Sequence, residues 1–299
     1  MFQKAVRRKS KLRLGLTGPS GSGKTYGALL IAKGLGGKVA VIDTETGSAS
    51  MYAHLLDFDV LELQPPYSPE RFIEAMEAAA AAGYKVVILD SITHEWSGSG
   101  GCLEINEQLA QSRFRGNTWS AWNETTPRHR AFLDAILRSP CHVIATMRSK
   151  TETTQAEVNG RKTVVKLGMK AEQRDGFEYE MSVVLDIVHN GHWAVASKDR
   201  TGLFVDQDPK AITPETGAQL LRWLESGAEP MPAQREISPA EMTLTFLNEA
   251  AKVGSAELRR AYEDLKGTPE FPPIWLAESA RLKAEAAKAD EFHGAAAAA

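Results

Sequence analysis

The chain of 299 residues has a net charge of −3 and ordinary apolar and charged fractions, so it can bury one large core or a core plus a smaller module. It contains no apolar run of about eighteen residues, which excludes a transmembrane helix, and its basic N-terminus lacks the apolar segment of a signal peptide. Its two cysteines, Cys102 and Cys141, provide neither a disulfide framework nor metal-ligand spacing, so we expect a cytoplasmic protein.

A glycine-rich segment lies between an alternating apolar run over 12–17 and a helical stretch over 26–33. It consists of Gly18, Pro19, Ser20, Gly21, Ser22, Gly23, Lys24 and Thr25. This is the G-x-x-x-x-G-K-[ST] pattern in its strand–loop–helix context. The backbone N–H groups of such a loop surround phosphate oxygens, the lysine reaches the β- and γ-phosphates, and the Thr25 hydroxyl binds Mg²⁺. The segment is therefore predicted to bind a nucleoside triphosphate.

Carboxylates follow the next predicted strand, over 38–43, at the edge where α/β sheets bind ligands. Asp43 and Glu45 belong to this turn, and one of them is placed to orient the water that attacks the γ-phosphate. A solvated turn is the alternative interpretation. A further strand over 60–63 and an alanine-rich helix over 70–82 follow.

Residues 84–91 form the second chemical landmark, an apolar strand that ends in Asp90. A carboxylate in this position, one βα unit after a phosphate-binding loop, holds Mg²⁺ through its water shell.

The segment between the turn at 97–101 and Pro127 combines a polar helix with arginines and aromatic residues. Arg113, Arg115, Trp119 and Trp122 suit contacts with phosphates and stacking on bases. A helix that packs its aromatic side chains into the core explains the same residues. A helix over 129–138 and a buried strand over 141–147 come next.

Residues 148–175 carry seven basic and four acidic side chains, a local net charge of +3. Asn159-Gly160 predicts a hairpin tip between two polar strands. The segment is placed to contact a phosphate backbone, with a solvated charged face as the alternative. The basic residues are Arg148, Lys150, Arg161, Lys162, Lys166, Lys170 and Arg174.

Two strands over 181–188 and 192–198 predict a hairpin that leads to Lys198-Asp199-Arg200. His189 and His192 flank its turn, and we expect surface histidines there. A helix over 214–225 completes an α/β core, 1–226, with a mostly parallel sheet flanked by helices. A linker at 227–239, a small acidic helical module at 240–290 and a disordered tail at 291–299 follow. The charge of the module favours a protein partner over nucleic acid.

Taken together, the landmarks resemble the RecA-type recombinase core, most closely phage-encoded RecA-core ATPases of the Sak-type single-strand annealing group. The resemblance rests on the phosphate-binding loop, Glu45, Asp90 and a Tyr-Ala pair at Tyr52, and Lys198-Asp199-Arg200 is similar to a Lys-Asn-Arg element of the RadA branch. It covers residues 11–225 and implies a RecA-like fold with ATP as the nucleotide.

The resemblance also implies roles for individual residues. Glu45 would polarise the attacking water and Tyr52 would stack on the adenine. Lys198 and Arg200 would act on the γ-phosphate of a neighbouring subunit, which implies a homo-oligomer with ATP at its interface. The loop after the 141–147 strand corresponds to the family's DNA-contacting loop.

Two departures from the family speak against strand exchange by a filament. The glutamine that reports on the γ-phosphate is replaced by the stretch Thr146-Met147-Arg148, and the N-terminal oligomerisation segment is reduced to residues 1–10.

The sequence thus predicts a Mg-ATP-dependent ATPase acting on single-stranded DNA in phage recombination or replication. Two alternatives stay open: a nucleotide-gated loader that recruits a DNA-processing partner, and an ATPase motor without a nucleic-acid role.

Overall fold

The computed structural model describes residues 4–158, 161–228 and 238–297, and within them all side chains except those of 151–158, 161–168 and 293–297. The chain divides into two compact units, Met1–Pro230 and Met231–Ala299. Their boundary lies inside the segment predicted as a linker, of which 229–237 lie outside the described residues.

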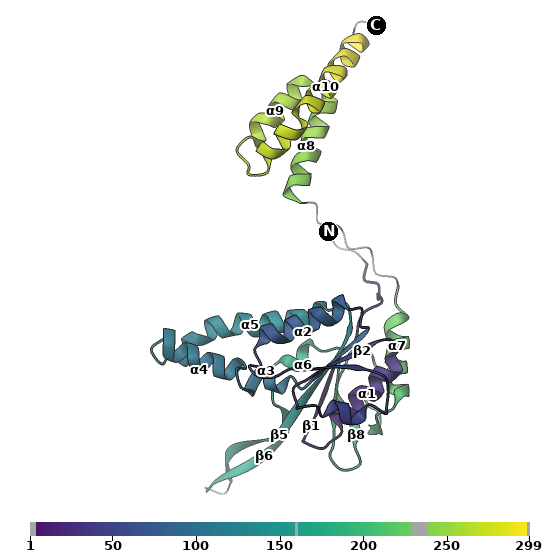
Figure 1. Cartoon of the computed structure of the whole chain (residues 1–299), viewed down its shortest axis with the longest axis vertical. Helices are drawn as coiled ribbons and strands as arrows, with labels where there is room; N and C mark the ends of the chain where they lie inside the picture. Colours follow the sequence, from purple (N-terminus) through teal and green to yellow (C-terminus); the bar gives the residue numbers. More distant parts are fainter. Residues whose placement is uncertain (1–3, 159–160, 229–237, 298–299) are drawn as a thin grey trace. The chain divides into compact units, whose positions relative to one another are not determined.

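The first unit contains one mostly parallel sheet, as the sequence predicts (Figure 1). Its strands follow the order β3-β2-β4-β5-β1-β7-β8-β9, and all neighbours up to β7 are parallel. β8 and β9 add to the β7 edge in antiparallel orientation. The strands are β1 Arg13–Gly18, β2 Val39–Asp43, β3 Asp59–Glu62, β4 Val86–Asp90, β5 His142–Val158, β7 Val183–Ile187, β8 Trp193–Asp199 and β9 Lys210–Ala211.

Helices cover both faces of the sheet, which explains why the central strands are continuously apolar. On one face α1 (Lys24–Leu35) and α7 (Pro214–Glu225) enclose a cluster that includes Val41 and Ile88. On the other face α2 (Pro69–Ala81) and α5 (Thr118–Arg138) pack over Ile42 and Leu89. Successive residues of a strand point to opposite faces, so each strand contributes to both clusters.

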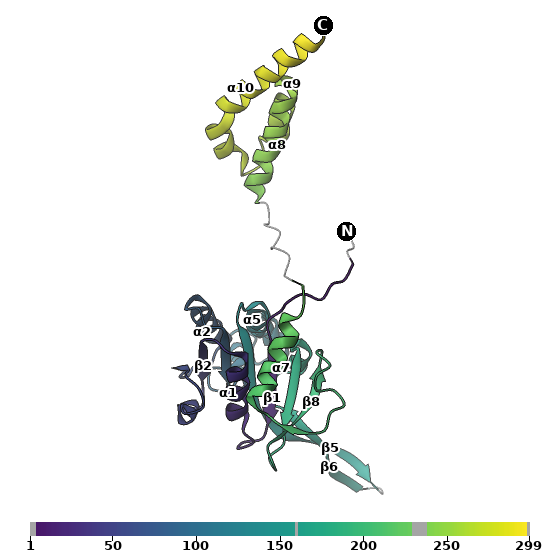
Figure 2. The same ribbon diagram turned by 90° about the vertical axis from the view of Figure 1, so that its right-hand side faces the viewer.

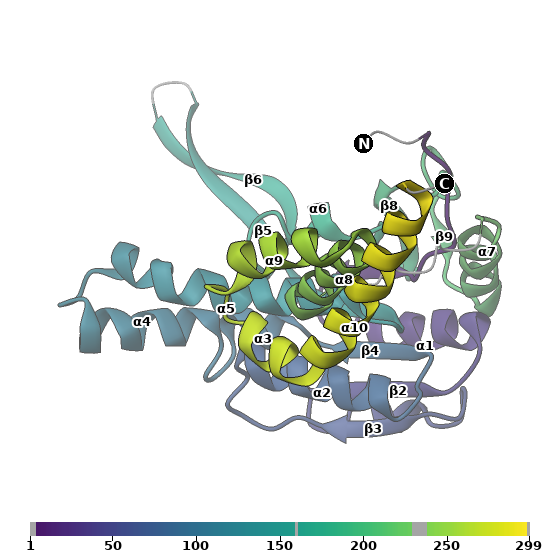
Figure 3. The same ribbon diagram turned by 90° about the horizontal axis from the view of Figure 1, so that it is seen from above.

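A helical hairpin lies between β4 and β5, and its second helix begins at Thr118 instead of at the predicted residue 129. After the short helix α3 (Thr93–Ser97), α4 (Cys102–Arg113) and α5 lie side by side and extend away from the sheet (Figures 1 and 3). Pro127 lies inside α5 with its ring on an exposed position. The helix continues because it buries Thr125, His129 and Phe132, whose packing outweighs the lost backbone hydrogen bond.

The strand β5 leaves the sheet and continues as half of a long hairpin with β6 (Arg161–Ala171). Figure 2 shows this hairpin projecting from the first unit. The sequence predicts two polar strands here, and the predicted tip at 159–160 lies outside the described residues. The short elements η1 (Ala49–Tyr52) and α6 (Phe177–Glu180) complete the unit.

The second unit consists of α8 (Pro239–Val253), α9 (Ser255–Leu265) and α10 (Phe271–Ala297) around a core of its own that includes Leu247, Leu258 and Leu282. Ser238 and Glu241 form a capping box at the start of α8. α10 runs to Ala297, through most of the tail predicted to be disordered, because alanine is the strongest helix former. Within the described part of the chain, no helix combines the length and apolar character needed to cross a bilayer.

Candidate nucleotide-binding site

The phosphate-binding loop connects β1 to α1, as predicted. Gly21 and Gly23 adopt φ angles of +75° and +93°, a region that side chains beyond glycine rarely enter. The first turn of α1 contains no acidic residue. Its N-cap is Gly23, which has no side chain to accept hydrogen bonds from the N–H groups of that turn. The backbone N–H groups of this turn therefore face the loop without a competing acceptor side chain, which is the arrangement that binds an anion.

Lys24 lies within the loop and is 8% exposed. Its ammonium donates hydrogen bonds to the carbonyls of Gly18 and Pro19, each at 2.9 Å. Burial lowers the pKa of Lys24, with Arg148 acting in the same direction and Glu45 and Asp90 opposing it. A phosphate in the loop would supply the counter-charge that this buried ammonium lacks.

Asp90 and Thr25, the predicted Mg²⁺ residues, are in direct contact. The Thr25 hydroxyl donates to Asp90 Oδ2 at 2.6 Å, and the Thr146 hydroxyl donates to Oδ1 at 2.5 Å. Asp90 is 1% exposed, and its pKa is raised, first by burial and then by the nearby carboxylates of Glu45 and Asp43. Hydroxyl and carboxylate oxygens in a place where negative charge accumulates fit a hard divalent cation.

Glu45 faces the loop from the end of β2 and forms an ion pair with Arg148 of β5. Arg148 Nη2 and Nε lie 2.9 and 3.0 Å from the same atom, Glu45 Oε1. Both side chains line the nucleotide cavity together with Lys24 and Thr25. The register of β1 and β5 places Arg148 at this cavity, because Arg148 is paired with Gly18, the first residue of the loop.

The cavity over the loop has a volume of about 540 Å³, within the range of small-molecule sites. Tyr52 and Tyr26 meet there edge to face, with ring centroids 5.7 Å apart. Met51 and Ile212 line the same cavity, so aromatic and apolar surface is available for a base beside the phosphate loop.

Lys198 and Arg200, predicted to act across a subunit interface, do not line this cavity. Both side chains donate to the backbone carbonyl of Tyr179. Lys198 lines a different cavity of about 790 Å³, together with Lys170 and Tyr179.

The described side chains among the residues predicted to contact DNA have different partners. Arg148 belongs to the nucleotide cavity, Lys150 lies 3.7 Å from Glu172, and Lys170 forms an ion pair with Asp175. Arg174 donates to Thr126 Oγ1 and lies over the ring of Trp122. The side chains of Arg161, Lys162 and Lys166, on β6, lie outside the described residues.

His192 is exposed, as expected, and it also contacts the phosphate-binding loop. Its Nδ1 lies 2.9 Å from the carbonyl oxygen of Ser22, and the ring lines the nucleotide cavity. Its φ of +52° is uncommon for a residue other than glycine. The turn after β7 lies at the same edge of the sheet as the loop after β1. This proximity follows from the parallel pairing of β1 with β7, which the sequence alone does not show.

The structure also contains a buried polar cluster of Glu95, Cys102 and His129. The sequence does not predict it, because these residues show no metal-ligand spacing. Glu95 Oε1 lies 3.1 Å from Cys102 Sγ and 3.0 Å from His129 Nδ1, and Gln173 donates to Oε2 at 3.2 Å. One ligand atom from each of the three residues lies within 4.8 Å of the others, which is close enough to share a metal ion. Burial and the Glu95 carboxylate raise the pKa of Cys102, so its thiol is a donor that satisfies this carboxylate and ties α3 to α4.

Comparison with known proteins identifies the unit that carries this site. No curated protein matches the sequence. A family model described as an AAA domain (AAA_24) matches residues 10–207, more than half of the chain. The match extends from the start of β1 past the end of β8, so it includes the phosphate-binding loop, Glu45 and Asp90. The chain therefore belongs to the AAA_24 family of P-loop nucleoside triphosphate hydrolases.

Proposed function

We propose that this protein is a Mg-ATP-dependent ATPase that acts on single-stranded DNA in phage recombination or replication, as an annealing or strand-handling protein. The observation that carries the ATPase part is the single cavity that joins Lys24, Thr25 and Glu45, with Asp90 directly beneath Thr25. Water attacks the γ-phosphorus, the bond to the β-phosphate oxygen breaks, and ADP and inorganic phosphate leave. Positioning and electrostatics supply most of the acceleration in this reaction class.

Each residue has one task in this reaction. Lys24 and the backbone N–H groups of the loop hold the phosphates, and Glu45 accepts a hydrogen bond from the attacking water. Thr25 and Asp90 would hold Mg²⁺, which when bound offsets the negative charge on the phosphate oxygens. Tyr52 would stack on the adenine, with Tyr26 at its edge.

The role in DNA binding is supported by two projections of the first unit. The hairpin of β5 and β6 belongs to the segment with a local charge of +3. At the end of the α4–α5 hairpin, Trp119 is 86% exposed, close in sequence to Arg113 and Arg115. An exposed aromatic ring close in sequence to cations suits stacking on unpaired bases, whereas Trp122 stacks on Trp96.

Assembly belongs to the same proposal. Lys198 and Arg200 lie outside the cavity of their own subunit, so any action on a γ-phosphate requires a second copy of the chain. A homo-oligomer with ATP at its interface would make hydrolysis depend on assembly, as arginine fingers do.

One experiment tests the proposal, using ATP hydrolysis and fluorescence anisotropy of labelled single-stranded DNA. Lys24→Ala should abolish hydrolysis, while Glu45→Gln should bind ATP but lower turnover at least about 100-fold. With ATP bound, Glu45→Gln should hold single-stranded DNA in a salt-sensitive manner, and Lys24→Ala should not.

The two parts of the proposal fail separately. Wild-type turnover by Glu45→Gln would refute its role toward water. No binding of either single-stranded or duplex DNA at low salt would refute the DNA role and leave an ATPase motor.

A second candidate function is a nucleotide-gated loader with weak turnover. It is favoured by the separate helical unit, whose acidic charge suits a protein partner. A loader would show ATP-dependent capture of that partner with little hydrolysis.

A further inference from the structure

The buried cluster of Glu95, Cys102 and His129 joins three helices where the α4–α5 hairpin begins. Glu95 belongs to α3, Cys102 is the first residue of α4, and His129 lies within α5. Glu95 and Cys102 are 0% exposed and His129 is 2% exposed. Figures 1 and 3 show α4 and α5 extending away from the sheet. The cluster therefore lies inside the fold, at the base of this projection.

The three side chains direct a sulfur, a nitrogen and an oxygen toward one another. Cys102 Sγ and His129 Nδ1 lie 3.1 and 3.0 Å from the same atom, Glu95 Oε1. Zn²⁺ holds sulfur at about 2.3 Å and nitrogen or oxygen at about 2.0 Å, which places neighbouring ligand atoms of a tetrahedral site roughly 3.3–3.6 Å apart. Small side-chain rotations therefore suffice to admit the ion.

The charge of Glu95 also favours a cation in this place. Its described hydrogen-bond partners are a thiol, an imidazole and the amide of Gln173, none of which is a lysine or an arginine. Arg128, whose charge acts on Cys102, is held by both carboxylate oxygens of Glu70. An unpaired carboxylate is costly to bury. A divalent cation bound by one carboxylate, one thiolate and one neutral imidazole has no net charge and would remove this cost.

The surroundings of the cluster suit a metal site. Gln173 Nε2 donates to Glu95 Oε2 at 3.2 Å, which leaves Oε1 facing the other two ligand atoms. The rings of Trp96 and Phe132 lie beside His129, with centroids 5.6 and 6.4 Å from that of the imidazole. Outer hydrogen bonds orient metal ligands, and an apolar shell limits the access of water.

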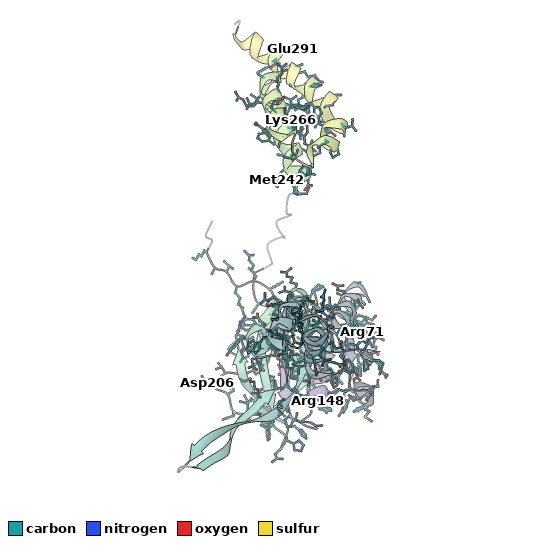
Figure 4. The ribbon with its side chains drawn as sticks, turned by 90° about the vertical axis from the view of Figure 1, so that its left-hand side faces the viewer. Arg71, Arg148, Asp206, Met242, Lys266 and Glu291 are labelled. Carbon is teal, nitrogen blue, oxygen red and sulfur yellow. The ribbon has the colours of Figure 1, made fainter. Side chains whose placement is uncertain are left out.

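The cluster also lies between the bases of both projections of the first unit. α3 begins at Thr93, whose hydroxyl accepts a hydrogen bond from the N–H of Arg148 at 2.9 Å. Figure 4 shows Arg148 near the place where the β5–β6 hairpin leaves the body of the unit. Gln173 follows the last strand of that hairpin. An ion at the cluster would therefore hold the base of the α4–α5 hairpin against the base of the β5–β6 hairpin.

We propose that Glu95, Cys102 and His129 bind a structural Zn²⁺ ion, at a site separate from the nucleotide cavity. The thiolate selects a borderline-soft cation, whereas Mg²⁺ prefers the oxygen ligands of Thr25 and Asp90. Binding releases the thiol proton to solvent, Nδ1 coordinates the ion, and the ring hydrogen moves to Nε2. Nε2 is buried without a hydrogen-bond partner in the described part of the chain, so no existing contact opposes this change.

Metal analysis of the full chain tests the site, with Zn²⁺ as the probe. After incubation with Zn²⁺ and gel filtration, the wild type should retain about one zinc ion per chain, and Cys102→Ser less than about a fifth of that. Serine keeps a donor toward Glu95, so only the sulfur ligand is lost. Cys141→Ser is the matched control, because this second buried cysteine donates to the Tyr84 carbonyl, and it should retain zinc as the wild type does.

Cobalt(II) in place of zinc identifies the ligand. Sulfur-to-cobalt charge-transfer absorption should appear in the wild type and in Cys141→Ser and be absent from Cys102→Ser. An ion held by oxygen ligands alone gives no such band. Absence of the band from the wild type, or the same band in Cys102→Ser, would overturn the inference and leave a hydrogen-bonded cluster only.

Thermal unfolding without nucleotide separates loss of the metal from damage to the fold. A chelator should lower the unfolding temperature of the zinc-loaded wild type by roughly 5 °C or more and leave that of Cys102→Ser unchanged. If Cys102→Ser does not fold, His129→Gln, which keeps an amide donor toward Glu95, replaces it. Equal shifts in wild type and variant, or none in the wild type, would contradict a structural ion.

The result does not depend on the proposed function. Lys24→Ala, which should abolish ATP hydrolysis, should retain zinc and show the cobalt band as the wild type does. Loss of the band in Lys24→Ala would place the metal at the nucleotide site and refute the cluster as its ligand set.

Discussion

Two buried charged side chains, Asp90 and Arg13, lie on strands of the nucleotide site and are held by different kinds of hydrogen-bond partner. Asp90 is held by two hydroxyl groups, whereas Arg13 donates to backbone carbonyls that include those of Cys141 and Ser139. Burial lowers the pKa of Arg13 to about 10, a value at which the guanidinium is still a cation at neutral pH. The ion pair of Glu45 and Arg148 differs from both, since its two side chains are partly exposed.

His142 predicts a dependence of stability on pH. Its Nδ1 accepts the N–H of Leu12 at 3.1 Å, and burial, with help from Lys11 and Arg13, lowers its pKa from 6.5 to about 4. The folded state therefore prefers the neutral ring. This contribution is complete above pH 6.5 and is lost as the pH falls through about 4, with a size on the order of 3 kcal/mol.

Urea unfolding at pH 7 and pH 4.5 measures this effect. His142→Asn keeps an acceptor but does not titrate, so its free energy of unfolding should fall less between the two pH values than that of the wild type. His54→Asn, at an exposed histidine, should follow the wild type. Parallel loss in the wild type and His142→Asn would contradict the assignment.

At the scale of elements, the orientation of α1 depends on its contact with α7. A Cβ added to Gly34 would lie 1.9 Å from the Pro214 carbonyl oxygen, and one added to Gly217 would lie 2.1 Å from that of Ile31. The helices approach so closely that backbone meets backbone. Since α1 begins with Lys24 and Thr25, this contact also sets the position of the phosphate-binding loop.

Gly217→Ala should therefore disturb both stability and binding. Forcing the helices apart should lower the free energy of unfolding by roughly 1–3 kcal/mol and weaken nucleotide binding. Thermal unfolding and ADP titration measure the two effects. Gln219→Ala, at an exposed position of the same helix, serves as the control, and a Gly217→Ala protein as stable as this control would show that the contact can relax.

At the scale of the whole molecule, the two units contain separate hydrophobic cores. The clusters on the two faces of the sheet use residues of the first unit, and the cluster around Leu247 and Leu282 uses residues of the second. Every residue that lines the nucleotide cavity belongs to the first unit.

A fragment of residues 1–230 should fold and bind nucleotide as the full chain does. Each unit buries its own core, so the first unit keeps its core when the second is removed. Circular dichroism and nucleotide titration check this, with an expected change in affinity of less than about 3-fold. A larger loss would mean that the helical unit supports the site.

The amino-acid sequence alone determined the local features of this protein. The phosphate-binding loop, the carboxylates after β2 and β4, and helix α7 follow from residue patterns over a few positions, where local geometry dictates residue type. Only the tertiary structure decided which distant residues meet. The pairing of Arg148 with Gly18 brought a residue predicted to contact DNA into the nucleotide cavity, and the strand pairing of β7 with β1 brought His192 there. Such contacts depend on the order of strands in the sheet, which sequence periodicity does not encode because every buried parallel strand has the same apolar pattern.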